Sequence, residues 1–484
     1  MATVDSGGCL AVRTLRMIGA TNGQQQRGVQ GRFWQTEISP CDREGKSDKP
    51  RKEADAAVRK PGNSSLIFLA LAALLLVLTV ACGREEEKGT PTATRTAIAT
   101  GTPTAAAEVP GITDTEIILG SHCALSGTYG AAYAPIIAGI KAYFNYVNAE
   151  EGGVCGRQIV FKAEDDHFLP AGAVDATKKL LERDKVFAII AGIGTAAHSA
   201  VWEDLNKKGV PDLWIMSGAH KWAAEPEKYP WSIAILPDYY VEATIVGKYI
   251  SENMAGKKVG IIYENDDYGK DELAGLKNGL DPDKNELVSE QSYEMTDVSI
   301  RSQVSNMKDA GADVVLGACI PPTCSQLVRE ADRLGWHPQF FIGYVNSDPM
   351  MFQYASPELM EGVITLQANK LSNWTDDPAV AEHHRIMKEY SDSLPGNFTI
   401  AGQEAAVLTV EALSRTCDNL TRQGLMDAVH SFQDYQLELA LPGITITLSP
   451  TDHLGIEAMR MLKATVVDGK GKWEYFGDII SFRD

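Results

Sequence analysis

A glycine-containing turn in the first half of the chain has the residues expected of a carboxylate site. A run typical of a buried strand, residues 186–191, leads through a Gly-Ile-Gly turn ending at Gly194 into a helical stretch that begins near Ala197. The first N–H groups of a helix have no partner within the helix and lie at the positive end of its dipole, which suits an anion. Thr195 would add a hydroxyl, although threonine at this position also serves as an ordinary helix cap.

The same turn lacks the pattern of a dinucleotide-binding enzyme. The full G-x-G-x-x-G pattern fails because Ala197 stands at its third glycine, and the export signal described below would separate the chain from cytoplasmic NAD. The chain has neither a G-x-S-x-G nucleophile turn nor an H-E-x-x-H helix. His383 and His384 lie on a polar helical stretch and are expected to face solvent. The sequence therefore predicts a protein that is not an enzyme and needs no cofactor.

The cysteines indicate disulfide chemistry rather than metal binding. Of the eight cysteines, two lie before residue 58 and one, Cys82, ends the export signal. Five remain in the body of the chain: Cys123, Cys155, Cys319, Cys324 and Cys417. An odd number leaves at least one thiol free. Cys319 and Cys324 are the pair expected from proximity, and because no second Cys or His pair lies close by, we predict no metal site.

An apolar run at residues 66–81 precedes Cys82 and resembles an export signal. It is shorter than the roughly 20 residues that cross a bilayer, and two basic residues stand on its amino side. The run ends in Leu-Thr-Val-Ala before Cys82, which resembles a bacterial lipobox with Thr79 where leucine is usual. We therefore expect a lipid on Cys82. Ordinary secretory cleavage near Ala81 and an uncleaved membrane anchor are the alternatives.

The segments around this signal have separate predicted roles. Residues 1–57 are polar and Gln-rich, and we expect them to be a leader outside the mature protein, with translation starting at Val58. Residues 58–81 form the lipoprotein signal peptide. Residues 82–110 carry the acylated Cys82 and a Thr/Ala/Pro-rich stretch that cannot bury a core and is expected to be a tether. The body would then work at the extracytoplasmic face of the cell membrane, held there by its lipid anchor.

The composition of the chain excludes nucleic acid as a partner. The formal net charge is -19 at pH 7, from 64 acidic against 45 basic residues. An acidic chain repels phosphate groups, whose binding requires clustered Lys and Arg. The hydrophobic fraction of 44% and the charged fraction of 23% are ordinary for a globular protein, and the chain after Pro110 is long enough for two domains.

Short apolar runs alternate with helical patterns after residue 116, which indicates parallel sheets built of β-α-β units. One helical stretch places Ile136, Ile140, Phe144 and Val147 on a single face. The first half has predicted strands at 117–119, 159–163, 186–191 and 213–216 and further helices at 171–183, 197–206 and 239–253. The pattern restarts with strands at 259–263, 287–293, 314–316, 340–342 and 363–366. Two similar α/β lobes in tandem are the simplest account.

The last part of the chain differs from this alternation. It is mainly helical at 379–390, 400–414 and 425–430, and it ends with β-like alternation at 444–448 and a strand at 473–476. Such a tail suggests that the chain crosses back between the two lobes.

Several short motifs occur in the order found in the leucine/isoleucine/valine-binding family. They include Gly-Ser-His-Cys-Ala-Leu-Ser-Gly at 120–127 and others at 148–156, 165–166, 194–195, 210–211, 217–219, 265–270, 310–315, 441–444 and 449–452. Each is weak alone, but the collinear set covers essentially all of residues 111–480. The chain therefore resembles the solute-binding components of ABC importers that have a type I periplasmic-binding fold. The closest likeness is to members whose ligands are carboxylates other than free amino acids.

This resemblance implies an α/β fold of two doubly wound lobes joined by three crossovers. Lobe one would comprise residues 111–234 and 367–440, and lobe two residues 235–366 and 441–484. A small solute would bind between the lobes at the carboxyl ends of the strands, and hinge closure would present the monomer to permease and ATPase subunits. A binding protein that docks on a sensory receptor would have the same fold and is the alternative.

The resemblance also implies which residues bind the solute. The turn at Gly194, Thr195 and Ala196 corresponds to the family's site for the ligand carboxylate. The loop after the next strand supplies backbone groups and one hydroxyl, which points to Ser217, Ala219 and His220. The alternative for His220 is that it faces solvent, as a lone histidine in a loop more often does. Tyr268 matches an aromatic residue of lobe two that covers the ligand, and the alternative is that it packs on the following helix.

One departure from the family concerns the amino group of a solute. Amino-acid-binding members carry an acidic residue after the strand equivalent to 340–342, and here Val345 stands at that position. An unpaired ammonium in a closed cleft is costly, so a free amino acid would require Asp348 to move in. Tyr129, Tyr133 and Trp222 are expected to rim the cleft, and aromatic walls suit an apolar ligand. We therefore expect a carboxylate with an apolar body, either a hydrophobic amino acid or an aromatic acid.

Overall fold

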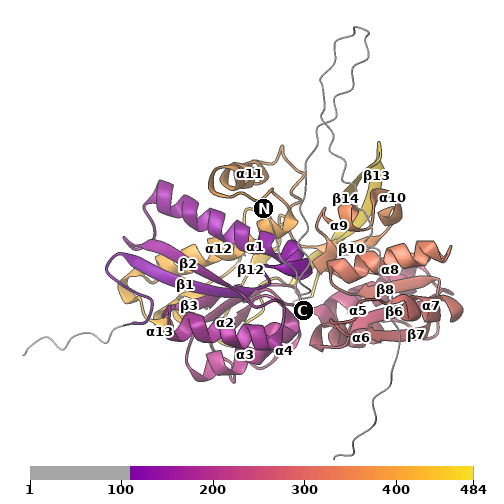
Figure 1. Ribbon diagram of the computed structural model, residues 1–484, viewed down its shortest axis with the longest axis horizontal. Helices are drawn as coiled ribbons and strands as arrows, with labels where there is room; N and C mark the ends of the chain where they lie inside the picture. The colour runs from indigo at the N-terminus through magenta and orange to yellow at the C-terminus, as the bar shows by residue number, and fades with distance from the viewer. Residues whose placement is uncertain (1–108, 483–484) are drawn as a thin grey trace, which may run out of the picture. The chain divides into compact units, whose positions relative to one another are not determined.

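The computed structural model describes residues 109–482, which belong to one compact unit, Ile98–Asp484 (Figure 1). The leader at 1–57, the signal peptide at 58–81, Cys82 and nearly all of the tether lie outside the described residues. Within residues 109–482, no helix combines the length and apolar character needed to cross a membrane.

Lobe one is built on a five-stranded sheet in which all neighbouring strands run parallel. The strand order is β2-β1-β3-β4-β5. The strands are β1 (Glu116–Cys123), β2 (Gln158–Asp165), β3 (Ala188–Ile190), β4 (Asp212–Ile215) and β5 (Ser232–Ala234). The three strands β3, β4 and β5 are buried along their whole length, as expected for a parallel sheet covered on both faces. The sequence predicts the first four strands, and the short β5 is an addition.

Helices cover this sheet in two groups. α1 (Gly127–Tyr146) packs against α12 (Asn397–Arg415), and α2 (Pro170–Glu182) packs against α3 (Thr195–Lys207). Figure 1 shows α1 and α2 on opposite sides of the strands. α11 (Pro378–Tyr390) packs on α1, and α13 (Arg422–Val429) packs on α12. The predicted apolar face is confirmed, since Ile136, Ile140, Phe144 and Val147 are all buried.

Lobe two repeats the strand order of lobe one. Its parallel strands are β6 (Lys258–Glu264), β7 (Glu286–Tyr293), β8 (Val314–Ala318), β9 (Gln339–Ile342) and β10 (Ile364–Gln367), in the order β7-β6-β8-β9-β10. A hairpin of β13 (Ala458–Val467) and β14 (Lys470–Ser481) extends this sheet antiparallel to β10. The prediction of two similar α/β lobes is therefore confirmed, but the sequence pattern finds only part of β14 and none of β13.

The helices of lobe two also lie in pairs. α5 (Tyr239–Asn253) packs on α6 (Asp267–Gly279), and α7 (Arg301–Asp309) packs on α8 (Pro321–Arg333). The Asp238 carboxylate accepts the N–H groups of Tyr240 and Val241 and so caps α5. The remaining short elements are α4 (Lys221–Ala224), α9 (Met351–Tyr354), α10 (Pro357–Met360), η1 (Val147–Glu151), η2 (Tyr344–Asn346), η3 (Cys417–Asn419), β11 (Tyr435–Gln436) and β12 (Thr445–Ile446). The predicted alternation at 444–448 thus contains only the two-residue β12.

The chain passes three times between the lobes. It first crosses between β5 and α5, and it crosses again after β10, where Asn369 pairs with Ala440 of lobe one. The third crossing precedes β13, because Leu454 still pairs with Ala234 of β5. Residues up to Leu454 thus lie along lobe one, whereas the family resemblance implied a boundary after Ala440.

His383 is buried, contrary to the expectation that it faces solvent. Its Nδ1 lies 2.8 Å from Gln403 Oε1 and its Nε2 lies 2.8 Å from Thr399 Oγ1, both on α12. The expectation is wrong because α12 covers this face of α11. Burial lowers the pKa of His383 to about 4, so the ring is a neutral packing group at physiological pH.

Candidate functional site

A cavity lies where the carboxyl ends of strands from both sheets meet. Its lining residues follow β3, β4 and β5 in lobe one and β6, β8, β9 and β10 in lobe two. In a doubly wound sheet the strand order reverses direction at such a place, which leaves a crevice for a ligand. The empty space amounts to about 1010 Å³, including the part that opens to solvent. Apolar and aromatic side chains form most of the wall.

The start of α3 forms one side of this cavity. Gly194, Thr195, Ala196 and Ala197 all line it, so the first turn of the helix borders the empty space. Gly194 has a φ of 97°, and a Cβ at this position would come within 2.7 Å of a ring carbon of Phe168. Glycine is therefore required both by the backbone and by the neighbouring ring. The helix N-terminus offers an anion its free N–H groups.

A buried hydroxyl pair supports the Thr195 side chain. Thr195 Oγ1 lies 2.7 Å from Ser217 Oγ, and Ser217 Oγ also accepts from Trp222 Nε1 at 2.9 Å. Because Ser217 already accepts one hydrogen bond, it can donate to Thr195, which leaves the Thr195 proton for a ligand oxygen. Ser217 is fully buried behind Thr195 and does not line the cavity itself. Trp222, expected at the rim, is buried and orients Ser217.

His220 and Tyr129 connect the two lobes instead of lining the cavity, and Ala219 also lies outside the lining. His220 Nδ1 lies 2.6 Å from Asp238 Oδ2, and this hydrogen bond raises the pKa of His220. The backbone N–H of His220 donates to Asp271 Oδ2 on α6. The Tyr129 hydroxyl of α1 donates to the Met295 carbonyl of lobe two at 2.6 Å. These contacts hold the first turn of α1 and the loop after β4 against lobe two.

Aromatic rings from both lobes form the walls. In lobe one Tyr133 stacks on Phe168 with ring centroids 5.0 Å apart and on Phe398 at 6.0 Å. On the side of lobe two, Tyr239 lies 4.5 Å from Tyr268 and 5.6 Å from Tyr344, again between centroids. Tyr133 and Tyr268, two of the residues suggested by the sequence, therefore lie at the cavity, where each is packed by other rings.

Val345 lines the cavity, and Asp348 does not. The Asp348 carboxylate accepts the N–H groups of Met350 and Phe398 at 2.9 and 3.0 Å, and the residue is only 5% exposed. Burial raises the pKa of Asp348. Its oxygens are already used to hold backbone groups, so movement toward a solute would break two hydrogen bonds.

The cavity is also lined by three carboxyl side chains. The sequence pattern does not single out any of these residues, which are Glu264, Asp266 and Glu404. Burial raises the pKa of Glu264 to about 8, and the nearby Asp266 adds to the rise. Burial likewise raises the pKa of Asp266 to about 6 and that of Glu404 to about 8. Among the described residues that line the cavity there is no Lys, Arg or His. Of the three carboxyl residues, only Glu264 had a sequence signal, which was its position at the end of a buried strand.

A row of buried ionisable groups lies behind the Gly192–Gly194 turn. His122 Nδ1 is 2.7 Å from Asp166 Oδ2, His122 Nε2 is 2.9 Å from His198 Nδ1, and His198 Nε2 is 2.9 Å from Asp212 Oδ2. All four side chains are fully buried. A Cβ on Gly192 would come 2.5 Å from His198 Nδ1 and 2.9 Å from His122 Nε2, so this glycine makes room for the histidine pair. The row positions the turn that begins α3.

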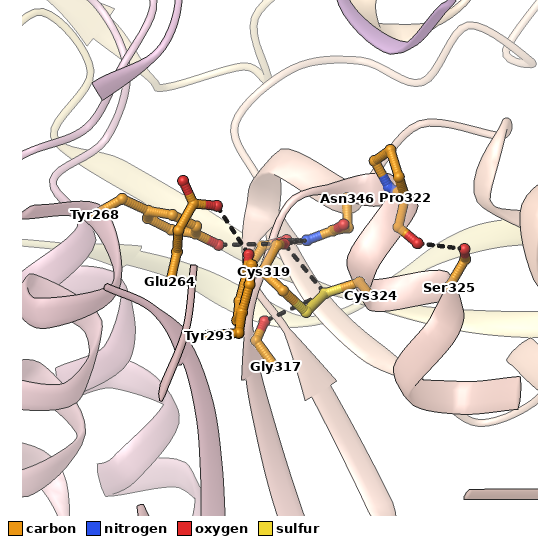
Figure 2. Close-up of a disulfide and its surroundings, with 10 residues drawn as sticks. Glu264, Tyr268, Tyr293, Gly317, Cys319, Pro322, Cys324, Ser325 and Asn346 are labelled. Carbon is orange, nitrogen blue, oxygen red and sulfur yellow. Dashed lines mark hydrogen bonds between the residues drawn. A yellow bond between two sulfur atoms is a disulfide. The ribbon is translucent and has the colours of Figure 1, made fainter. Parts of the chain in front are cut away.

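Four of the five body cysteines are joined in pairs. Cys319 and Cys324 form a disulfide at the end of β8, and Cys155 and Cys417 form a second one in lobe one (Figure 2 shows the first). Cys123 is a buried free thiol. Spacing gives no hint of the second pair, because 262 residues separate its members. Within residues 109–482, no three His, Cys, Asp or Glu side chains are grouped so that they could hold a metal ion.

A family model described as periplasmic binding protein matches residues 116–472. An amino acid binding protein of Pseudomonas aeruginosa is 23% identical over 273 residues, which are 55% of this chain and 70% of the relative. The Leu/Ile/Val-binding protein homolog 2 of Brucella abortus is 24% identical over 238 residues, 48% of this chain and 62% of the relative. The match to this second relative thus spans less than two thirds of its length.

Solved structures share the fold. A branched chain amino acid ABC transporter protein from Thermus thermophilus with bound valine superposes with a TM-score of 0.68 at 17% identity, over 77% of this chain and 98% of that one. A fatty acid ABC transporter substrate-binding protein from Thermomonospora curvata superposes with a TM-score of 0.68 at 24% identity. This match covers 79% of this chain and 96% of that one. At these identities the likeness shows the fold alone, which is the two-lobed architecture described above.

Proposed function

Because the chain belongs to the periplasmic binding protein family, we propose that it is the extracytoplasmic solute-binding component of an ABC importer. The family implies a location outside the cytoplasm, and the family and fold are those of substrate-binding proteins rather than enzymes. In this proposal a lipid on Cys82 keeps the monomer beside its permease. A single acyl chain binds a membrane only marginally, and stable anchoring takes two such signals. The lipid of a lipoprotein supplies two acyl chains.

The proposed solute is a carboxylate with an apolar body. One observation carries this choice: the first turn of α3 and the Thr195 hydroxyl border a cavity whose walls are otherwise mainly apolar and aromatic. The free N–H groups at the helix start and the Thr195 proton would hold the carboxylate, and rings such as Tyr133 would pack on the body. One structural relative has bound valine and another is a fatty acid ABC transporter substrate-binding protein; valine and fatty acids are both acids with an apolar part, which supports this class.

Calorimetry on the purified, ligand-stripped protein tests the solute class. Leucine and benzoate serve as the first two probes, and binding of either supports a carboxylate site. Thr195→Val keeps the shape of the side chain and removes its hydroxyl, so we expect affinity to fall roughly tenfold, the effect of one hydrogen bond to a charged group. Thr375→Val, at an exposed position of lobe one, is the matched control. Unchanged affinity in Thr195→Val would contradict the proposed site.

Transport and anchoring need separate measurements. Uptake of the bound acid into vesicles that contain the cognate permease would support the importer, whereas kinase activation without uptake would support the sensory alternative. Cys82→Ser should release the protein from the membrane fraction without changing solute affinity. Mass spectrometry of the native protein should find a diacylglyceryl group on Cys82 and no peptides from residues 1–57.

A further inference from the structure

Two side chains in the wall of the cavity each have an oxygen atom without a hydrogen-bond partner. Asn369 lies at the second crossover and Glu404 lies on α12, and both line the cavity while being only 5% and 2% exposed. Asn369 Nδ2 donates to Glu404 Oε2 at 2.5 Å, but Asn369 Oδ1 and Glu404 Oε1 are buried and have no partner within residues 109–482. Because buried polar atoms are nearly always paired, these two oxygens point to a group that the protein does not supply.

The other amide side chains of the cavity wall already have their partners. Gln367 Nε2 donates to Ser347 Oγ at 2.7 Å, and Gln367 Oε1 accepts the backbone N–H of Asn369 at 3.3 Å. Asn397 Nδ2 donates to the Ser347 carbonyl, and Asn397 Oδ1 accepts the Ser372 N–H, both at 2.8 Å. Of the amide side chains that line the cavity, only Asn369 has an unpaired oxygen among the described residues.

The pair of Asn369 and Glu404 offers one hydrogen-bond acceptor and one donor. The amide oxygen Asn369 Oδ1 can only accept. Burial raises the pKa of Glu404 to about 8, so its carboxyl is largely protonated at neutral pH. Glu404 Oε2 accepts from Asn369, which leaves the proton on Oε1, where it can be donated. A hydroxyl group matches this arrangement, because it can donate to Asn369 Oδ1 while its oxygen accepts from Glu404 Oε1.

A wall of aromatic rings connects this pair with the start of α3. A Cβ on Gly194 would come within 2.7 Å of the Phe168 ring, and Tyr133 stacks on Phe168 with ring centroids 5.0 Å apart. Tyr133 also stacks on Phe398 at 6.0 Å, and Phe398 lies on α12 together with Glu404. All five residues line the cavity. A carboxylate at α3 and a hydroxyl at Glu404 can therefore belong to one solute whose apolar body lies along the rings.

We propose that Asn369 and Glu404 together bind a hydroxyl group on the apolar body of the solute. The inference rests on the proposed function, because the carboxylate of the same solute lies at the start of α3. Hydroxy-substituted apolar acids are then preferred over the same acids without the hydroxyl. An ammonium group does not suit the pair, since it cannot accept the Glu404 proton. The two buried oxygens are reached by a small rotation of side chains in the wall, a common change when a ligand binds.

Matched pairs of acids test the proposal by calorimetry on the ligand-stripped full chain. The pairs are para-hydroxybenzoate and benzoate, para-hydroxyphenylacetate and phenylacetate, and ω-hydroxycaproate and caproate, which differ within a pair only by the hydroxyl. The probes para-ethylphenol and hexanol carry the hydroxyl without a carboxylate. For at least one pair we expect the hydroxy acid to bind roughly tenfold tighter or more, the effect of satisfying buried polar groups that otherwise stay unpaired.

Variants of the pair show whether the hydroxyl binds at these two residues. Asn369→Leu removes the accepting oxygen and should abolish the preference for the hydroxy acid. Glu404→Gln keeps a neutral donor in place of the protonated carboxyl and should retain most of the preference, whereas Glu404→Leu should lose it. The preference is a ratio measured within one variant, so a general loss of affinity cancels, and either leucine variant suffices if the other does not fold. Asn373→Leu, exposed in the loop after the second crossover, is the matched control.

The outcomes separate this inference from the proposed function. Equal affinity within every pair overturns the inference and leaves the carboxylate site intact. A preference that survives in the leucine variants also overturns it, because the hydroxyl then binds elsewhere. A loss in Glu404→Gln as complete as in Glu404→Leu overturns it as well, because the pair would then act through an ionised carboxylate. Binding of the phenol and the alcohol but of no acid keeps the hydroxyl site and overturns the carboxylate site, and binding of no probe overturns both.

Discussion

Lobe one and lobe two share a strand order and differ in how their buried ionisable groups are neutralised. In lobe one, His122 and His198 stand between Asp166 and Asp212, so each carboxylate faces an imidazole. In lobe two, Glu242 of α5 and Glu272 of α6 face one another, and burial raises the pKa of both. The same topology therefore tolerates opposite electrostatic solutions at its core.

The difference lies in the partners of the buried carboxyl groups. Hydrogen bonds in series give Asp166 and Asp212 each an imidazole partner, and burial lowers the pKa of His122. The lobe-two pair has no base, and it stays buried only by keeping a proton between the two carboxyls. Lobe one thus pairs each of these buried carboxyl groups with an imidazole, whereas lobe two depends on a proton that rising pH removes.

The two disulfides sharpen the comparison and give the largest expected effect. Cys155–Cys417 of lobe one closes a loop with a sequence separation of 262, and Cys319–Cys324 of lobe two closes one of 5. Loop-closure entropy predicts a loss of about 5.5 kcal/mol for Cys155→Ser with Cys417→Ser and about 2 kcal/mol for Cys319→Ser with Cys324→Ser. Urea unfolding of the two double variants measures this, and equal losses would show that loop length does not control the effect.

Removing one member of the histidine pair is expected to lower the free energy of unfolding somewhat less than removing the Cys155–Cys417 disulfide. His198→Ala leaves His122 and Asp212 buried and without their shared partner, which should destabilise lobe one by about 3 kcal/mol or more. The urea midpoint should fall with an unchanged slope, and solute affinity should fall as well because the row supports the turn before α3. His337→Ala, at an exposed position, is the control. A loss as small as that of the control would mean that the row does not stabilise the lobe.

How much of this fold the sequence could predict depended on element length and composition. Long, strongly patterned segments were predictable, and the predicted helix at 239–253 coincides with α5. β5 has only three residues, too few for a periodic signal. β13 begins with Ala, Met, Arg and Met, which have little intrinsic preference for strands, and its Thr and Val residues come only at its end; it is paired with β10 and β14 on both sides.

The candidate site was predictable only where one short segment builds it. The turn at Gly194 and Thr195 is such a segment, since glycine and a capping hydroxyl before a helix are readable locally. Glu404 reaches the cavity from α12, far along the chain from β6, and no local pattern distinguishes it from a surface glutamate. The His122–His198 contact likewise joins residues 76 positions apart. Chemistry assembled by tertiary packing needed the structure.

The pH dependence of stability gives the smallest of these effects and tests the proton in lobe two directly. Burial raises the pKa of Glu242 to about 7, from an ordinary value of 4.5. The native protein therefore keeps a proton that the unfolded chain has lost. The stabilisation is complete below about pH 4.5 and is lost as the pH rises through 7, by up to about 1.4 kcal/mol per pH unit for one group.

Glu242→Gln should flatten this decline, because a neutral amide replaces the proton-holding carboxyl. The Gln oxygen can still accept the Tyr344 N–H, which Glu242 Oε1 accepts at 2.6 Å, and the Gln amide can donate to Glu272. Between pH 6 and 7 the wild type should lose about 1 kcal/mol more than the variant in urea unfolding. Glu252→Gln, exposed on the same helix, should follow the wild type. A variant whose stability falls with pH as steeply as the wild type would mean that the carboxyl pair holds no proton, and the contrast between the two lobes would then lie in packing alone.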